Sequence, residues 1–327
     1  MKIRRSAYAV VAALALLTAA CTSSNDNKGG NSAAASSGNG KYNYKIAVVT
    51  HGAAGDAFWS VVKAGVTKAG TDMGDQVTYQ SDGNPAKQAQ LIDAAVNQKV
   101  DGLVVSMANP DALKASIQKA VAAGIPVITI NSGQDRSAEF GAMTHVGQSE
   151  SQAGEAAGAK LKEAGVKKLL CVIQEAGNVG LEARCAAAAK GVGGNAQNLQ
   201  VDNNNLTGAE STIKAKLQSD KSIDGVLTLG GQMAVVASRA IESSGSSAKL
   251  GTFDLNSDVT KLVEDGKVLF AVDQQPYVQG YLPIVMLTLY KSNLNTVGGG
   301  LPVATGPSFV TKENAAAVAA LAEAGTR

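Results

Sequence analysis

From residue 44 onward, short apolar runs rich in β-branched residues alternate with longer segments in which apolar residues recur at helical spacing. The short runs are continuously apolar, which is typical of strands that are buried on both faces. The predicted strands span 45–50, 76–81, 102–107, 126–131, 143–148, 168–174, 198–203, 225–230, 249–254 and 268–274. The predicted helices span 57–73, 86–98, 110–123, 149–164, 181–192, 208–219, 231–244, 257–265 and 279–293.

This repetition of strand and helix predicts parallel strands that are joined by crossover helices. Ten strands are more than one compact domain of this length usually holds, so we expect an α/β protein with two doubly wound parallel-sheet lobes. The predicted N-terminal lobe comprises 43–147 plus 276–305. The predicted C-terminal lobe comprises 148–275 plus 306–327.

The last part of the chain predicts how the two lobes are connected. After the helix at 279–293 come the short strand "LPVATG", Pro307, a second short strand and a terminal helix. These few elements after residue 293 are too short for a third domain. They are explained if the chain returns once to the first lobe and once to the second. We therefore expect a three-segment hinge near 147–150, 274–277 and 304–308, with a ligand cleft between the lobes.

The N-terminus has the pattern of a targeting segment. The basic stretch "MKIRR" precedes the apolar run "AYAVVAALALLTAA", which is too short for a confident membrane span. "LTAAC" resembles the lipobox of bacterial lipoproteins, so we expect a signal peptide at 1–20 and a lipid on Cys21. Residues 21–42, rich in Ser, Gly and Asn, would form a flexible tether on the outer face of the cell membrane. The alternative is an ordinary secretion signal with a leftover cysteine.

Composition narrows the function further. Hydrophobic residues make up 45% of the chain and the formal net charge is +2, without a basic patch, which disfavours nucleic acid as a partner.

Outside the cytoplasm Cys171 and Cys185 can form a disulfide; the alternative is two buried free thiols. We expect no metal, cofactor or catalysis, because metal-ligand spacing, phosphate-binding glycine loops and a nucleophile elbow are missing from the sequence.

Candidate ligand groups follow the predicted strands. In doubly wound sheets, ligands bind beyond the carboxyl ends of the strands. Carboxylates and amides can bind neighbouring hydroxyls, and an aromatic ring packs against the C–H face of a sugar. The side chains at these strand ends therefore predict a polyhydroxylated ligand. They are Asp56, Phe58, Trp59, Asn131, Ser132, Glu175, Asn178, Arg184, Asp254 and Gln274.

Some of these residues have a purely structural alternative. Asp56 could be only a helix cap. Phe58 and Trp59 could be core residues, and Arg184 could form a salt bridge between the lobes.

The chain resembles the type I periplasmic binding proteins, the sugar-capturing subunits of bacterial ABC importers in the ribose and glucose/galactose group. The resemblance covers nearly all of 44–320 and rests on "DAFWSVVKAG", "IPVITIN", "QEAGNVGLEAR", "GTFD" and "FAVDQQP", which occur in the family's order. It implies sugar-binding roles for the matching residues. These are Asp56, Phe58, Asn131, Asn178, Arg184, Asp254 and Gln274.

The chain departs from this family at four positions. Gly230 replaces a ligand-binding Asn, Gly180 replaces an acid, Ser132 replaces a cation, and Leu206 is expected where the family places a second aromatic residue. These changes favour a smaller or less polar ligand than glucose or ribose, such as a polyol or a deoxysugar.

The function expected from the sequence is therefore that of a lipid-anchored solute-binding protein. It would be a monomer that closes over a monosaccharide or polyol and docks on an ABC permease. The alternatives are a ligand sensor for a chemoreceptor or sensor kinase, and a receptor for a non-sugar solute such as a nucleoside.

Overall fold

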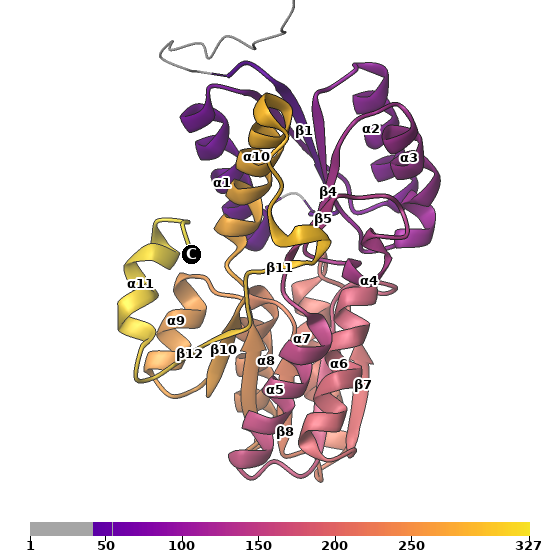
Figure 1. The fold of residues 1–327 in the computed structure, drawn as a ribbon. Helices are drawn as coiled ribbons and strands as arrows, with labels where there is room; N and C mark the ends of the chain where they lie inside the picture. The colour runs from indigo at the N-terminus through magenta and orange to yellow at the C-terminus, as the bar shows by residue number, and fades with distance from the viewer. Residues whose placement is uncertain (1–41, 54) are drawn as a thin grey trace, which may run out of the picture. The chain divides into compact units, whose positions relative to one another are not determined.

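The computed structural model describes residues 42–53 and 55–327, so the predicted signal peptide, Cys21 and most of the predicted tether lie outside the described residues. The described part is an α/β fold with two six-stranded sheets, as predicted (Figure 1). The first sheet has the order β11-β5-β4-β3-β1-β2 and the second has the order β12-β10-β9-β8-β6-β7. Every neighbouring pair is parallel except β10 and β12.

The first lobe is built around the first sheet. Its elements are β1 (Lys45–Thr50), α1 (Ala57–Met73), β2 (Gln76–Ser81), α2 (Pro85–Asn97), β3 (Gly102–Ser106), α3 (Pro110–Ala122), β4 (Val127–Ile130), α4 (Gln134–Ser137) and β5 (Thr144–Gly147). Two later elements join it, α10 (Pro276–Asn293), which packs on α1, and β11 (Val303–Ala304), which pairs with β5.

The second lobe follows the same plan. Its elements are α5 (Glu150–Glu163), β6 (Leu169–Ile173), α6 (Val179–Val192), β7 (Ala196–Gln200), α7 (Leu206–Ser219), β8 (Gly225–Thr228), α8 (Gly231–Ser244), β9 (Lys249–Phe253), α9 (Ser257–Glu264), β10 (Phe270–Asp273), β12 (Ser308–Thr311) and α11 (Ala315–Glu323). A short 3-10 turn, Gly298–Gly300, precedes β11. Because β10 and β12 lie in the second sheet while α10 and β11 belong to the first lobe, the chain passes between the lobes three times.

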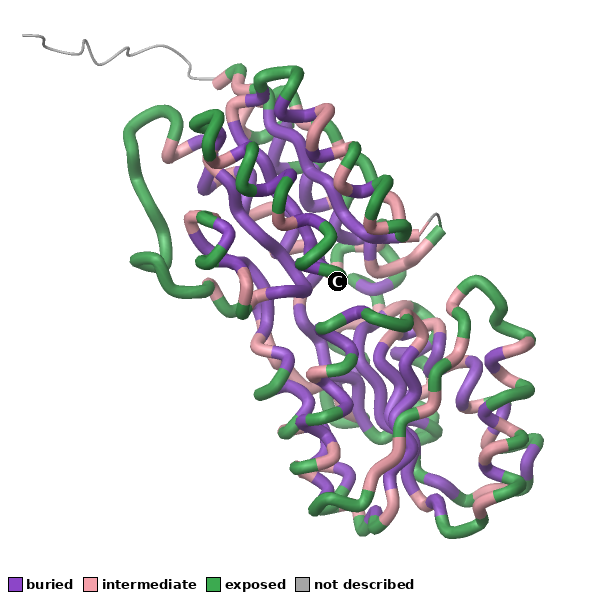
Figure 2. The backbone as a smooth tube through the Cα atoms, turned by 90° about the vertical axis from the view of Figure 1, so that its right-hand side faces the viewer, coloured by how far each residue is buried: buried purple, intermediate pink, exposed green. Residues whose placement is uncertain are grey.

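The central strands of each sheet are continuously apolar because the sheet has a core on both faces, whereas the edge strands β2 and β7 are polar and only partly buried. In β1, Ile46 and Val48 belong to one buried cluster, whereas Ala47 and Val49 belong to the cluster on the opposite face. The residues of β6 divide in the same way between the two cores of the second lobe. Figure 2 shows the result, with buried strands between helices whose outer sides are exposed.

Two helix pairs pack with their backbones almost in contact. A Cβ on Gly65 of α1 would lie 2.2 Å from the carbonyl oxygen of Tyr277 in α10, and a Cβ on Gly158 of α5 would lie 2.2 Å from that of Ala188 in α6. Helix α6 is also bonded covalently to its sheet. Cys171 of β6 and Cys185 of α6 form a disulfide with a Cα–Cα distance of 5.8 Å.

Besides shifts of one or two residues at other element ends, the structure differs from the predicted elements in three places. Helix α10 begins at Pro276, three residues earlier than predicted, because a proline at the first helical position lacks only an N–H that would be unpaired there. Helix α4 has four residues, which is too short to produce a periodic pattern. Strand β7 ends at Gln200, so residues 201–203 belong to a loop instead.

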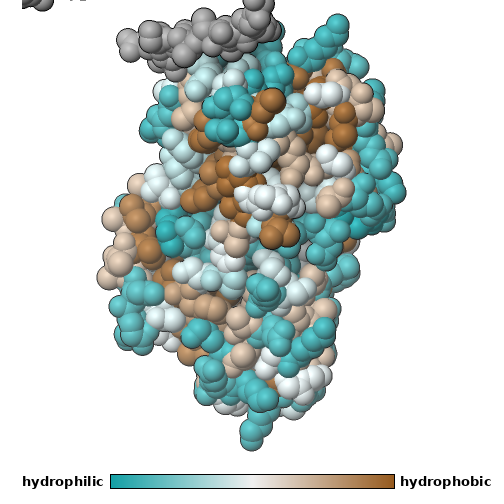
Figure 3. Space-filling model, in the orientation of Figure 1, coloured by the Kyte–Doolittle hydropathy of each residue, from teal (hydrophilic) through white to brown (hydrophobic). Residues whose placement is uncertain are grey.

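The face of the molecule shown in Figure 3 is largely polar, but it also carries apolar residues. On the face shown in Figure 3, apolar residues gather near the middle, over α10 and the segment that leads to β11. Leu294 and Leu301 of that segment are 74% and 70% exposed. Within the described part of the chain, no helix is long and apolar enough to cross a membrane.

Candidate ligand-binding site

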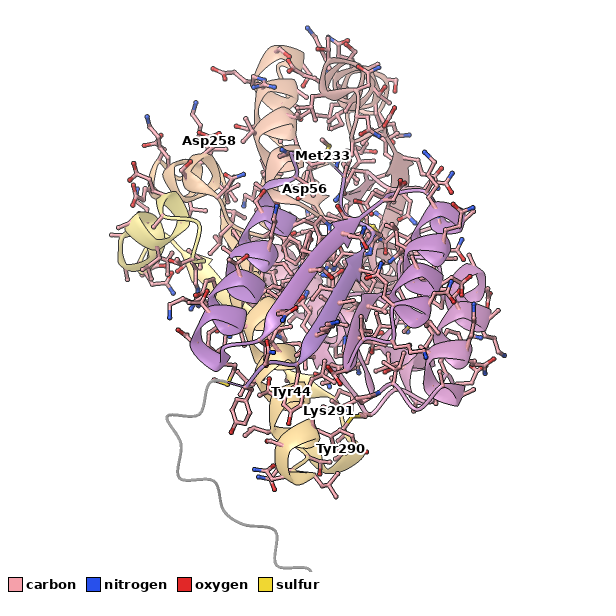
Figure 4. The ribbon with its side chains drawn as sticks, turned by 90° about the horizontal axis from the view of Figure 1, so that it is seen from above. Tyr44, Asp56, Met233, Asp258, Tyr290 and Lys291 are labelled. Atoms are coloured by element: carbon pink, nitrogen blue, oxygen red, sulfur yellow. A yellow bond between two sulfur atoms is a disulfide. The ribbon has the colours of Figure 1, made fainter. Side chains whose placement is uncertain are left out.

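The candidate site is a cavity between the two lobes, at the carboxyl edges of both sheets. The space between its walls amounts to about 590 Å³, part of which is open to the solvent. All ten residues that the sequence predicted as ligand groups line this one cavity. In Figure 4, Asp56 at the start of α1 lies near Met233 of α8, and both residues border the cavity, one from each lobe.

Asn131 and Asp254 occupy equivalent places in the two lobes. They directly follow β4 and β9, which hold the same position in their sheets. Both have left-handed backbone conformations, with φ of 61° and 66°. Such a φ is uncommon for residues other than glycine, although Asn and Asp tolerate it best. The two strand ends thus turn sharply at the cavity, and strained residues of this kind cluster at functional sites.

Gln274 connects these two residues across the lobes. Its Oε1 accepts a hydrogen bond from Asn131 Nδ2 (3.2 Å), and its Nε2 donates to Asp254 Oδ1 (2.7 Å). The side chain is 1% exposed. One amide from the second crossing therefore fixes the orientation of a polar group from each lobe.

The three crossings are also bonded to one another. Thr305 N donates to Gly147 O (2.9 Å), and Thr305 Oγ1 donates to Gln274 O (2.7 Å). Gln279 Nε2 lies 3.0 Å from Gln274 O and 3.1 Å from Thr305 Oγ1. The cavity thus rests on a hydrogen-bonded hinge.

The aromatic side of the cavity is set by the start of α1. Asp56 caps this helix, because its Oδ1 accepts hydrogen bonds from the backbone N–H groups of Phe58 (2.9 Å) and Trp59 (3.3 Å). The ring of Trp59 meets those of Phe58 and His51 edge to face, at centroid distances of 5.1 and 4.7 Å. A Cβ on Gly52 would lie 2.4 Å from Trp59 Cγ, so the indole needs a glycine there. Trp59 is therefore both a core residue and a cavity residue, while Phe58 is only half-buried.

Arg184 is held by Glu150, a residue that the sequence did not single out. Its Nε and one terminal nitrogen donate to the two carboxylate oxygens of Glu150 at 2.5 and 2.8 Å. The other terminal nitrogen donates to Leu229 O (3.2 Å), and the guanidinium lies over the ring of Phe253 at 4.6 Å. Because both partners belong to the second lobe, this is not a salt bridge between lobes. Three of the five guanidinium donors are used, which leaves two for a ligand.

On the opposite wall, the start of α6 touches the first lobe. Asn178 caps α6 through Oδ1 and donates from Nδ2 to Glu175 Oε2 (2.8 Å). Ser132 Oγ lies 3.3 Å from Asn178 Oδ1, and a Cβ on Gly180 would lie only 2.8 Å from this hydroxyl. The two small residues Ser132 and Gly180, which the sequence marked as separate departures, therefore oppose each other across the lobes.

Charge in the cavity is shifted by burial. Burial raises the pKa of Asp254 to about 7, although nearby Arg184 acts in the opposite direction. Burial also raises the pKa of Asp56 and of Glu175. His51 is neutral at physiological pH, because burial and then the charge of Arg184 lower its pKa to about 3. Three carboxyl groups and one guanidinium thus line the cavity, a balance that disfavours an anionic ligand.

One expectation about the cavity is wrong. Leu206, expected to cover the second face of the ligand, is 38% exposed at the start of α7 and is not part of the lining. The second lobe instead lines the cavity with smaller apolar and amide side chains. They include Leu181, Leu229, Met233, Leu255, Asn203, Gln232 and Asn256. His51 and Gln174 also line the cavity and were not predicted as ligand groups, although Gln174 is the first residue of the motif "QEAGNVGLEAR".

This fold and cavity define a two-lobe solute-binding protein. Residues 46–293 match the model of the periplasmic binding protein domain, and the chain belongs to that family.

Relatives at the level of sequence and structure agree with this assignment. A carbohydrate transporter from Acidothermus cellulolyticus, solved in complex with myo-inositol, is 44% identical with a TM-score of 0.86, over 88% of this chain and 100% of that one. The ribose import binding protein of Bacillus subtilis is 29% identical over 69% of this chain and 74% of its own length. The xylose/arabinose-binding protein of Sulfolobus acidocaldarius is 26% identical over 68% of this chain and 60% of its own length.

Proposed function

We propose that this protein is an extracytoplasmic receptor that captures a monosaccharide or cyclic polyol for an ABC importer, with myo-inositol as the first ligand to test. One observation carries the proposal: ten carboxylate, amide, hydroxyl, guanidinium and aromatic side chains from two lobes line a single cavity. A ligand with many hydroxyls needs a partner for each one that it removes from water, and this set supplies donors and acceptors together. The myo-inositol in the 44%-identical structure supports the choice of first ligand.

The mechanism follows from the hinge. Lobes with the predicted boundaries would rotate about the three crossings, and the ligand would stabilise the closed form because only that form surrounds it. The structure has contacts suited to the closed form, such as the hydrogen bond from Val179 N to Ala108 O (3.0 Å) between the lobes. In the full proposal, a lipid on Cys21 anchors the receptor and the closed form docks on a permease.

A thermal-shift screen tests the ligand class. The purified protein is heated with myo-inositol, D-ribose, D-glucose, pentitols and, as the contrasting class, adenosine and uridine. A ligand present at 100 times its Kd stabilises the folded protein by about 2.7 kcal/mol, which raises its Tm measurably. We expect at least one sugar or polyol to do so. A shift with nucleosides alone would show that the ligand class is wrong.

A further inference from the structure

Gln174 and Gly230 lie side by side at the carboxyl edge of the second sheet. Strands β6 and β8 are paired with Val172 opposite Thr228, and continuing this register by two residues places Gln174 opposite Gly230. A Cβ on Gly230 would lie 2.9 Å from Gln174 Nε2. The carboxamide of Gln174 therefore occupies the space that a side chain at position 230 would fill.

The backbone at Gly230 does not by itself require glycine. Its φ is −162°, an extended conformation that any residue can adopt. The glycine matters because of the space it leaves, which the amide of Gln174 enters from the neighbouring strand.

The carboxamide also has unused hydrogen-bonding capacity. Gln174 Oε1 is buried and has no hydrogen-bond partner among the described residues. An unpaired buried acceptor is costly, and a hydroxyl hydrogen would satisfy it. Gln174 lines the cavity and also the outer part of the cleft next to it. A hydroxyl of a ligand in the cavity would therefore lie near this side chain.

We propose that Gln174 is a ligand-contacting residue that determines specificity: its carboxamide accepts a hydrogen bond from one ligand hydroxyl in the space left by Gly230. The inference rests on the proposed function and deepens it. The amide that position 230 lacks is then supplied by the residue that follows β6. The cavity therefore distinguishes polyols by the configuration at the carbon whose hydroxyl reaches Gln174.

Calorimetric titration of four proteins tests this inference: the wild type, Gln174→Ala, Gly230→Ala and the double variant. The ligands are myo-inositol, scyllo-inositol, which differs in the configuration of one hydroxyl, further inositol stereoisomers and the monosaccharides of the screen. Gln200→Ala, which removes an exposed glutamine of β7, is the matched control. Thermal unfolding without ligand checks that each variant is folded, and Gln174→Met replaces Gln174→Ala if the latter is not.

For the ligand that binds best, we expect Gln174→Ala to weaken binding roughly tenfold or more, since a buried hydroxyl loses its partner. Gly230→Ala should weaken it by displacing the same amide, so the double variant should bind no more weakly than Gln174→Ala. The order of affinities among the stereoisomers should change in Gln174→Ala and stay unchanged in the control.

Two results would overturn parts of this account, and they can be distinguished. If Gln174→Ala binds every ligand with wild-type affinity, or if the two substitutions act additively, Gln174 does not read the ligand, while the proposed function stands. If the wild type binds no sugar or polyol at all, the proposed function fails and the role of Gln174 fails with it.

Discussion

Replacing Glu150 by glutamine should impair both the fold and the site, because Glu150 is the carboxylate that neutralises and orients Arg184. The two side chains are 3% and 8% exposed, so neither charge is well solvated. Removing one partner of a buried ion pair costs about 3–5 kcal/mol. We expect the lower end, because Leu229 O and the ring of Phe253 still hold the guanidinium.

The size of the effect on melting follows from this value. For domains of 150–250 residues, 1 kcal/mol corresponds to about 2–4 °C, so about 3 kcal/mol should lower the Tm by about 6–12 °C. Ligand affinity should fall as well, since a guanidinium held only by Leu229 O and the ring of Phe253 directs its two remaining donors less firmly than one that also bonds to Glu150.

A double variant separates the two effects. Replacing a buried ion pair by apolar residues of similar size is often neutral or stabilising, so Glu150→Leu with Arg184→Met should recover most of the lost stability. It should not recover binding, because the donors of Arg184 are gone. Urea unfolding without ligand measures the stability, and calorimetric titration with myo-inositol measures the binding. Wild-type stability and affinity in Glu150→Gln would refute the reasoning, and so would a double variant that binds normally.

Three further outcomes are expected. Since the pKa of Asp254 is raised from 3.8 to about 7, the folded protein holds the extra proton between these values. The stability of wild type relative to Asp254→Asn should therefore fall as pH rises from about 4 to 7, by about 4 kcal/mol at most, and a pH-independent difference in urea unfolding would contradict this. Phe58→Leu should weaken sugar binding by about 0.5–1.5 kcal/mol at nearly unchanged Tm; unchanged affinity in calorimetry would exclude a stacking role. Gly158→Ala should lower the free energy of unfolding by about 1–3 kcal/mol, because the new Cβ would press on the carbonyl of Ala188. The control Ser151→Ala, on the exposed side of the same helix, should leave it unchanged. Equal unfolding curves for the two variants would show that α5 and α6 can separate freely.

The sequence alone was sufficient to predict the fold and the polar side chains at the edge of the cavity, and there is a physical reason for this. Hydrophobic runs that are buried on both faces differ clearly from amphipathic helices, and parallel strands bring their carboxyl ends to one edge. Asn131, Asp254 and Gln274 could therefore be placed together although they are far apart in the chain. Glu150 could not, because an acid in the first turn of a helix is common on solvent-exposed helices, and nothing in the pattern indicates that its partner is Arg184.

A departure from a family pattern is harder to interpret from one sequence, because its effect depends on the residue that packs against the changed position. Gly180 and Ser132 each suggest a lost polar group, but they face each other across the lobes, and a larger residue at 180 would collide with the hydroxyl of Ser132. Gly230 likewise suggests a missing amide until Gln174 is found in the same space. A count of lost contacts from the sequence therefore overestimates how apolar the cavity is. If Gln174 contacts the ligand as proposed, the missing Asn at position 230 no longer gives a reason to prefer a deoxysugar over a cyclic polyol.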